Sequence, residues 1–396
     1  MITHGLDVAA WLIAIATLPG SLLLAVLSAA ALLPVARRKT PPAPANAARL
    51  AFVVPAHDEA ENIHKTVASL VAACQADGNA ETWVVADNCS DDTAERARLG
   101  GAQVIERRNP LQRGKGHALA FAFEQLPTAA GEWLIVVDAD STLEAGFLPA
   151  MRAAMTAQRH ALQACYLSQT GDHLRSRVSR IGQWGFNLVR PLGRQRLGCS
   201  CGLFGNGFAL RRSLLAQLPY TAHSVVEDLE YHLLLVAAGE RVHFVPTARV
   251  TGEIADTVDG ARTQRTRWEG GRLRMLKDHF LPLSRRCLRG ERAAIEPLAD
   301  LLLLPLGMHC LLLVLAALLG GAGLWAAAFG VLAIGVYLVA TLVRGPTRRA
   351  DLGALLMSPV YLAWKLTLLP ATLKQGRREA AWVRSRRNNE TANNHE

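Results

Sequence analysis

The chain has 396 residues, of which 51% are hydrophobic, and its 43 Lys and Arg residues against 33 Asp and Glu residues give a formal net charge of +10. This length is enough for about two or three domains, and so high an apolar content argues against an ordinary soluble enzyme. The central part of the chain has no basic helix or aromatic-studded basic strand of the kind that binds nucleic acid, so we expect membrane lipid as the anionic partner and no nucleic acid.

The first apolar stretch, residues 8–34, carries no charge and is long enough to cross a bilayer core about 30 Å thick. A signal peptide is the alternative, but the stretch lacks a basic start and is too long for a signal-peptide core. We therefore expect a transmembrane helix within residues 1–34. Arg37, Arg38 and Lys39 follow it, whereas the short N-terminus holds no Lys or Arg, which predicts that the chain continues on the cytoplasmic side.

A linker rich in Pro and Ala leads into a soluble region at residues 47–285, where short apolar runs alternate with helical patterns. The expected strands and helices follow one another at residues 49–57, 59–75, 82–87, 91–99, 102–107, 116–126 and 132–140. Such alternation predicts an α/β domain with a doubly wound, mostly parallel sheet and helices on both faces. Ligands of such sheets bind outside the carboxyl ends of the strands.

Three of these strands end in polar residues at what should be one edge of the sheet. Helix capping explains residues such as Asp58 and Ser141. It does not explain Asp87, Asp138 or Asp140, which come before the cap positions. In an extended segment, residues two apart project on the same face, so Asp138 and Asp140 could converge on one point. Carboxylate oxygens in that arrangement suit Mg²⁺ or Mn²⁺ shared with phosphate oxygens.

Two later stretches place charged residues at the start of helices. Residues 108–119 hold Arg113 and Lys115 among glycines, which suits a cradle for phosphate, although Lys115 could equally be a solvated charge. Glu227 and Asp228 begin an apolar-faced helix, where an acidic first turn stabilised by the helix dipole is the simpler interpretation.

Gln264, Arg267 and Trp268 lie on neighbouring positions of a helix at residues 263–276, with Gln264 and Trp268 four apart on one face. A helix that lies on lipid, with Trp at the interface, is the alternative, and both roles are compatible if a site opens towards the membrane. The six arginines within residues 175–196 predict a solvated or lipid-facing surface.

The C-terminal part is apolar again. Residues 298–319 and 324–343 predict a transmembrane hairpin within 295–345. Residues 352–371 contain a lysine and two prolines and have basic residues on both flanks, which favours an interfacial or re-entrant helix over a span. That helix and a basic cytoplasmic tail make up the expected last segment, residues 350–396.

The ordered set of polar residues resembles the family 2 inverting glycosyltransferases, and within them the membrane branch that contains cellulose, hyaluronan and poly-N-acetylglucosamine synthases and ceramide glucosyltransferase. The set consists of Asp87, Asp138, Asp140, Glu227, Asp228, Gln264, Arg267 and Trp268. The resemblance covers about residues 50–280 and implies a GT-A-like fold. His57 stands where an aromatic residue is more common, so we expect no role for it.

The resemblance implies a donor site at the strand ends. Asp87 would meet the nucleotide base in a pocket that Pro55, Ala56 and Glu59 also line. Two further residues would act on the diphosphate: Asp138 would contact the nucleotide, and Asp140 would bind Mg²⁺ or Mn²⁺ bridging the diphosphate.

The resemblance implies that Asp228 is the general base, and it places Lys115 and Glu227 among the substrate-binding residues. Gln264, Arg267 and Trp268 would hold the acceptor and the diphosphate near the membrane surface. The chemistry requires these residue types in any case, because a sugar hydroxyl needs a carboxylate to accept its proton and a departing diphosphate needs cations.

The implied activity is that of a metal-dependent hexosyltransferase in the membrane. It would move a sugar from a nucleotide-diphosphate sugar, first of all a UDP-sugar, to a glycan or lipid-linked acceptor in cell-surface polysaccharide (exopolysaccharide) or glycolipid synthesis. We expect it in the bacterial inner membrane with a cytoplasmic catalytic domain, where a polysaccharide export partner would fit. The alternatives are a nucleotidyltransferase of similar fold, or the nucleotide-binding component of a polysaccharide export complex.

Overall fold

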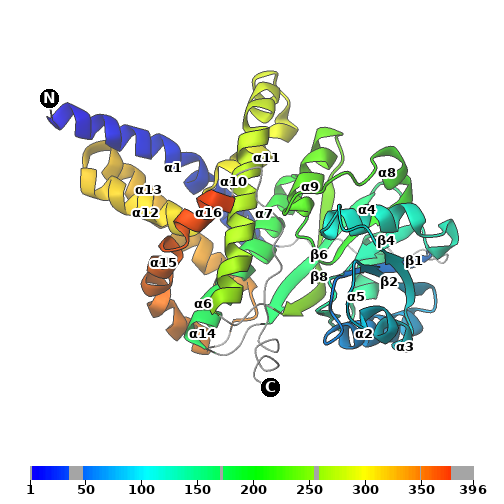
Figure 1. Cartoon of the computed structure of the whole chain (residues 1–396). Helices are drawn as coiled ribbons and strands as arrows, with labels where there is room; N and C mark the ends of the chain where they lie inside the picture. The colour runs from blue at the N-terminus through cyan, green and yellow to red at the C-terminus, as the bar shows by residue number, and fades with distance from the viewer. Residues whose placement is uncertain (1, 35–47, 170–172, 254–257, 348, 376–396) are drawn as a thin grey trace. The chain divides into compact units, whose positions relative to one another are not determined.

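The computed structural model describes residues 2–34, 48–169, 173–253, 258–347 and 349–375 (Figure 1). The basic residues that follow the first apolar stretch, most of the linker, and the basic tail lie outside the described residues. The chain forms two compact units, which we treat separately. The α/β unit comprises 35–169 and 200–254, and the helical unit comprises 1–34, 170–199 and 255–396.

The α/β unit contains an eight-stranded sheet in the order β3-β2-β1-β4-β7-β6-β8-β5. Its strands are β1 (Leu50–Ala56), β2 (Ala80–Asp87), β3 (Gln103–Arg107), β4 (Trp133–Val136), β5 (Ser141–Leu143), β6 (Ala161–Gln169), β7 (Phe208–Arg211) and β8 (Val242–Glu253). β1 pairs in parallel with β2 and β4, β2 pairs in parallel with β3, and β6 pairs in parallel with β8. β7 is antiparallel to β4 and β6, and β5 is antiparallel to β8. The predicted α/β class is confirmed, with a mixed sheet.

The helices of this unit are α2 (Ile63–Asp77), α3 (Thr93–Leu99), α4 (Lys115–Gln125), α5 (Phe147–Ala154), α8 (Arg212–Gln217) and α9 (Glu227–Ala237). The apolar face predicted for α2 is buried in the core, where Ile63, Val67 and Leu70 have no exposed surface. The core also contains the apolar residues of β1 and β4. Strands that are buried on both faces have continuous apolar runs in their sequences, which explains why β1 and β4 could be predicted clearly.

The helical unit contains ten α-helices among its described residues: α1 (Ile2–Leu32), α6 (Leu174–Trp184), α7 (Arg190–Leu197), α10 (Val258–Leu288), α11 (Ile295–Leu302), α12 (Leu306–Leu319), α13 (Gly321–Arg344), α14 (Arg349–Ala354), α15 (Ser358–Leu366) and α16 (Leu369–Gln375). Two stretches within the described part of the chain are long and apolar enough to cross a membrane, namely Leu6–Leu32 and Gly321–Arg344. The pair Arg292–Leu302 and Leu306–Leu319 is bent by 77°, so it is a broken span or a re-entrant loop. The first leg of the predicted hairpin is therefore bent.

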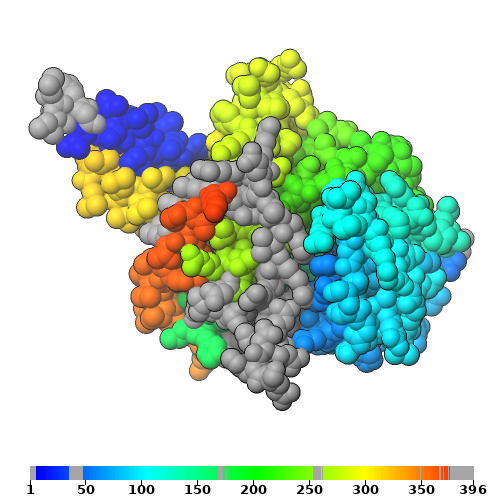
Figure 2. Space-filling model, in the orientation of Figure 1, coloured from blue at the N-terminus to red at the C-terminus, as the bar shows by residue number. Residues whose placement is uncertain are grey.

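The apolar surface of α1 is consistent with a span. Trp11, Leu12 and Ile15 on this helix, drawn in blue in Figure 2, are each more than 60% exposed (Figure 2). At its other end, Arg196 Nη1 donates to the Ala30 and Ala31 carbonyl oxygens at 2.6 Å, satisfying groups that a helix C-terminus leaves unpaired.

The prediction of a solvated or lipid-facing arginine surface is wrong for Arg190 and Arg194, which are 5% and 4% exposed. Both contact Asp300 of α11, and Arg194 also contacts Glu296. Arg272 of α10 joins the same network through Asp300 Oδ2 at 3.0 Å. Buried arginines are tolerated when carboxylates pair with them. Asp300 and Glu296 lie more than 100 residues along the chain from Arg190 and Arg194.

Candidate active site

Four of the predicted site residues meet where α4 and α9 begin. Lys115, the first residue of α4, donates from Nζ to the Asp138 carboxylate and, at 2.5 Å, to the Gly205 carbonyl oxygen. The same Nζ lies 3.9 Å from Glu227 Oε1, at the start of α9. Asp228 is the next residue. Oxygen atoms therefore surround Lys115 Nζ and favour a positive charge at this point. Hard oxygen ligands of this kind also suit Mg²⁺ or Mn²⁺.

Asp228 lies against Gly205, which has no side chain. A Cβ atom on Gly205 would lie 3.3 Å from Asp228 Oδ2 and 3.5 Å from Lys115 Nζ, and the Gly205 φ of +72° favours glycine. Burial raises the pKa of Asp228, although the Leu229 N–H, which donates to Oδ1 at 2.8 Å, and the charge of Lys115 oppose the rise. Burial alone would lower the pKa of Lys115, but the neighbouring carboxylates outweigh it and raise the pKa.

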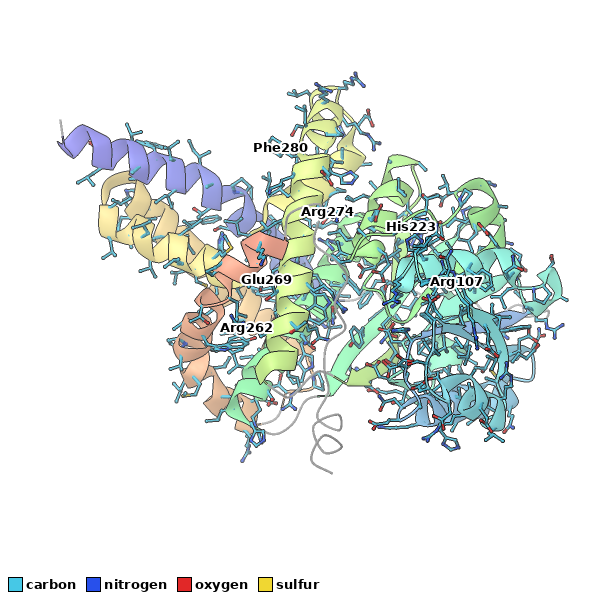
Figure 3. The ribbon with its side chains drawn as sticks, in the orientation of Figure 1. Arg107, His223, Arg262, Glu269, Arg274 and Phe280 are labelled. Carbon is cyan, nitrogen blue, oxygen red and sulfur yellow. The ribbon has the colours of Figure 1, made fainter. Side chains whose placement is uncertain are left out.

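The starts of α4 and α9 are held together by close backbone contact. A Cβ atom on Gly116 would lie 2.2 Å from the Ala222 carbonyl oxygen, so only glycine permits this approach. Beside it, the rings of His117 and His223 stack with centroids 4.0 Å apart and an interplanar angle of 12°. Figure 3 labels His223 in the loop before α9 and Arg107 at the end of β3 (Figure 3). Burial and the neighbouring His223 lower the pKa of His117, which favours its neutral form.

Asp87, the expected base-binding residue, is fixed by partners that the sequence did not reveal. Parallel pairing of β2 and β3 sets it opposite Arg107, whose Nη1 donates to Asp87 Oδ1 at 2.6 Å. Both side chains are buried. His57, for which we expected no role, has Nδ1 2.7 Å from the Asp87 carbonyl oxygen. The parallel pairing of β2 with β3 is the signal that could have identified Arg107 as the partner of Asp87.

Pro55, Ala56 and Glu59 lie at and just beyond the end of β1, the strand beside β2. The Glu59 N–H donates to Thr93 Oγ1 at 2.8 Å, and its carboxylate accepts from Asn62 Nδ2 at 3.1 Å. The three residues therefore share with Asp87 the carboxyl edge of the parallel strands, as predicted. Their contact with a nucleotide stays a prediction.

Asp138 and Asp140 do not lie in an extended strand, because β4 ends at Val136 and a turn follows. Asp138 faces Lys115, whereas Asp140 Oδ1 accepts from Ser141 Oγ at 3.1 Å. Asn206, which is fully buried, links the two ends of this turn. Its Oδ1 accepts from the Asp138 N–H at 3.2 Å, and its Nδ2 donates to Ser141 Oγ at 2.8 Å. Convergence of both aspartates on one metal ion stays a prediction.

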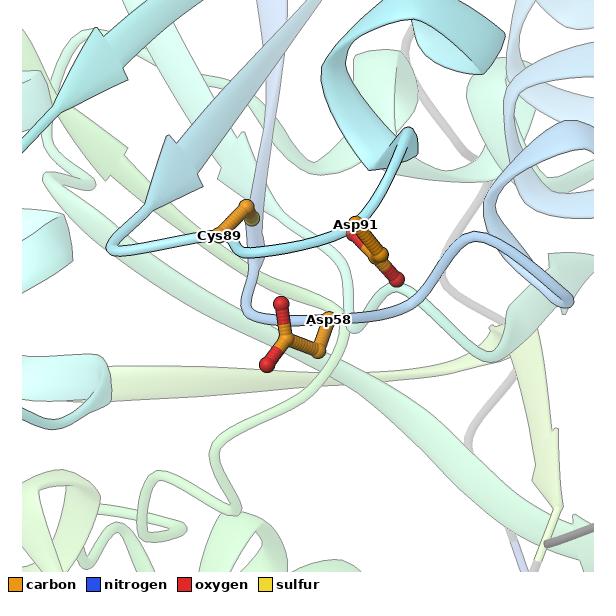
Figure 4. Close-up of side chains that lie close together, drawn as sticks. All are labelled: Asp58, Cys89 and Asp91. Atoms are coloured by element: carbon orange, nitrogen blue, oxygen red, sulfur yellow. The ribbon is translucent and has the colours of Figure 1, made fainter.

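Within the described residues, three potential metal ligands approach one another elsewhere, namely Asp58, Cys89 and Asp91 (Figure 4). Asp58 Oδ1 accepts from the Ser90 N–H at 2.7 Å, and Asp91 Oδ1 accepts from the Thr93 N–H at 3.0 Å. Burial raises the pKa of the Cys89 thiol, which keeps it protonated and a weak ligand. We interpret this group as a connection between the loops that follow β1 and β2.

The three residues expected to hold the acceptor lie in the other unit. Gln264, Arg267 and Trp268 are in α10, whose side chains include Arg262 and Arg274 (Figure 3). Trp268 is 37% exposed, as a residue that contacts an acceptor or lipid would be. Their part in a site with Asp228 stays a prediction.

Comparisons with known proteins agree with this fold. Residues 47–271 match the model of the family described as glycosyltransferase like family 2. The probable glycosyltransferase YdaM of Bacillus subtilis (strain 168) is 25% identical over 233 residues, covering 56% of this chain and 55% of YdaM. The chain therefore spans about half the length of that relative.

A solved structure shares this architecture. The mannosyltransferase PcManGT from Pyrobaculum calidifontis, in complex with GDP-Man and Mn²⁺, superposes with a TM-score of 0.58 at 18% identity, covering 94% of this chain and 98% of that one. Glucosyl-3-phosphoglycerate synthase from Mycobacterium tuberculosis, in complex with Mn²⁺, UDP and phosphoglyceric acid, gives a TM-score of 0.40 at 22% identity over 57% of this chain and 78% of that one. Because the family model takes in more than half of the chain, the protein belongs to the glycosyltransferase like family 2.

Proposed function

We propose that the protein is an inverting glycosyltransferase that moves a sugar from a nucleoside diphosphate sugar to a glycan or lipid-linked acceptor. The observation that carries the proposal is the meeting of Lys115, Asp138 and Asp228 at the starts of α4 and α9. A single displacement at a sugar carbon requires a base for the attacking hydroxyl and positive charge at the departing diphosphate, and Asp228 and Lys115 are groups of these two kinds.

In the proposed reaction, Asp228 accepts the proton of the acceptor hydroxyl as that oxygen attacks the sugar. Its raised pKa makes it a stronger base than an ordinary aspartate, and the charge of Lys115 helps to keep it ionised. Lys115 and the N-terminus of α4 bind the diphosphate. A divalent ion held by Asp140, with Asp138, would neutralise charge on the departing diphosphate. No second carboxylate is needed, because inversion takes one step.

The donor base lies, in this proposal, against Asp87 with Pro55, Ala56 and Glu59. The donor class to test first is a UDP-sugar, followed by a GDP-sugar, which PcManGT binds. The proposed location is the bacterial inner membrane, with the α/β unit in the cytoplasm. Support comes from the two span-length helices and from the basic residues after the first of them.

The experiment incubates the purified chain and Mn²⁺ with a panel of radiolabelled UDP- and GDP-sugars and membrane lipid extract, and then sizes the labelled product. Transfer of label to lipid or glycan with release of the nucleoside diphosphate supports the proposal. Release of labelled sugar 1-phosphate in place of a nucleoside diphosphate would identify a nucleotidyltransferase and overturn it.

A further inference from the structure

Asn206, in the loop before β7, is a buried residue that the proposed reaction does not use. It has no exposed surface, and neither has Gln163 of β6, which holds the loop in place. Gln163 Nε2 donates to the Asn206 carbonyl oxygen at 2.7 Å, and Gln163 Oε1 accepts from the Phe204 N–H at 3.0 Å. The Asn206 side chain therefore extends from a fixed backbone towards the turn that carries Asp138 and Asp140.

The direction of the hydrogen bonds around the Asn206 amide follows from the chemistry of its partners. The Asp138 backbone N–H can only donate, so the Asn206 atom 3.2 Å from this nitrogen must be the acceptor Oδ1. The amide nitrogen Nδ2 then faces Ser141 Oγ at 2.8 Å and donates to it. A hydroxyl group has one proton, which cannot point towards a donor, so the Ser141 hydroxyl must donate elsewhere.

The acceptor available to the Ser141 hydroxyl is the Asp140 carboxylate. Ser141 Oγ lies 3.1 Å from Asp140 Oδ1, and an ionised carboxylate only accepts hydrogen bonds. The position of Oγ is restricted by β8, where Ser141 pairs with Gly252 and a Cβ atom added to Gly252 would lie 2.8 Å from Oγ. The Ser141 hydroxyl thus has a fixed place and directs its proton to Asp140.

We propose that Asn206 is a positioning residue that, through the Ser141 hydroxyl, orients the Asp140 carboxylate for a divalent metal ion. The inference rests on the proposed function, because it requires Asp140 to bind that ion. Groups that hydrogen-bond to a metal ligand fix its orientation, and their loss typically weakens metal binding by about 10- to 100-fold. Because Asn206 also accepts from the Asp138 N–H, one amide fixes both ends of the turn that holds the two aspartates.

The test measures the Mn²⁺ affinity of the full-length chain, with UDP and with GDP, from the electron paramagnetic resonance signal of free Mn²⁺. Ser141→Ala is compared with the matched control Thr142→Val. Thr142 is the next residue of β5, and its Oγ1 lies 3.0 Å from Thr251 Oγ1, so the control also removes a hydroxyl contact from this strand. The thermal midpoint of each variant in EDTA measures its stability without metal.

Ser141→Ala should weaken Mn²⁺ binding about tenfold, because Asp140 loses a donor that orients it. Thr142→Val should leave the Mn²⁺ affinity unchanged, although both variants lose a hydrogen bond of β5. Asn206→Ala should also weaken Mn²⁺ binding. Its effect should be smaller in a Ser141→Ala background, since the influence of Asn206 on Asp140 passes through Ser141.

The outcomes separate this inference from the proposed function. If Ser141→Ala binds Mn²⁺ as tightly as the wild-type chain, or if Ser141→Ala and Thr142→Val lose affinity equally, the positioning role is overturned and the proposed function stands. If the wild-type chain binds Mn²⁺ with neither UDP nor GDP, both the positioning role and the metal-dependent part of the proposed function are overturned.

Discussion

Asp228 and Lys115 form the electrostatic centre of the candidate site. Burial raises the pKa of Asp228, and Lys115 opposes that rise. A general base works only while it is ionised, so activity should be lost as the pH falls through this raised pKa. The pH below which activity is lost therefore depends on Asp228 and Lys115 together, and not on Asp228 alone.

Replacing Lys115 with Met removes the charge that lowers the Asp228 pKa. The acidic limb of the kcat/KM profile should then move to higher pH, in addition to any loss of donor affinity, whereas Lys115→Arg should keep the limb in place. The measurement is a pH profile at saturating Mn²⁺. Limbs that coincide in the wild-type and Lys115→Met proteins would show that Lys115 does not influence the base.

Gly205 offers a second test at the scale of single residues. Gly205→Ala forces a side chain into a φ of +72° and places Cβ 3.3 Å from Asp228 Oδ2, so we expect a stability loss of about 1 kcal/mol and a fall in kcat of at least about tenfold. Gly239→Ala is the control, because Gly239 has a φ of +83° and a Cβ added there would meet nothing within 4 Å. It should lose similar stability and keep kcat. Equal kcat in both variants would contradict the close contact at Asp228.

At the scale of elements, the sequence predicted the part of the sheet that local patterns specify. β1, β2, β3 and β4 are linked through α2, α3 and α4, so apolar runs and helical periodicity identified them in the sequence. Asp87 was correctly expected at the carboxyl edge of these strands. The antiparallel place of β7 between β4 and β6 was not predicted, because residues 170–207 separate it from β6. Arg107 and Asn206 were missed for the same reason, since their partners Asp87 and Asp138 lie 20 and 68 residues away along the chain.

The pairing of β2 with β3 makes a prediction about stability. Arg107→Met would leave Asp87 buried without its cation, so we expect a loss of about 3–5 kcal/mol in the free energy of unfolding. The control is Arg98→Met, which breaks the exposed Arg98–Glu106 pair and should cost less than about 1 kcal/mol. Urea unfolding of both variants measures the difference. Similar losses in the two would show that the Arg107–Asp87 pair is not a buried pair in solution.

At the scale of the whole molecule, the chain joins an α/β unit to a helical unit with span-length apolar helices. The α1 C-terminus is fixed by arginines from two other helices, Arg196 of α7 and Arg344 of α13, through the Ala31 carbonyl oxygen. A helix anchored in this way belongs to the folded unit.

The two candidate spans predict how the protein fractionates. After cell lysis it should sediment with membranes, resist extraction by alkaline carbonate, and dissolve in detergent. The reason is that each Å² of apolar helix surface removed from water is favourable by about 25 cal/mol. Immunoblotting of the fractions is the measurement, with a soluble cytoplasmic enzyme as the control. Complete release by carbonate would place the protein on the membrane surface only.

The central claim is that Asp228 is the base of a sugar transfer. The most direct measurement is acceptor-dependent release of nucleoside diphosphate by wild-type protein and by Asp228→Asn, together with donor affinity for both. We expect the variant to bind the donor as the wild type does and to turn over at least about a hundredfold more slowly, in line with the loss of a general base. Undiminished turnover by Asp228→Asn would contradict the account.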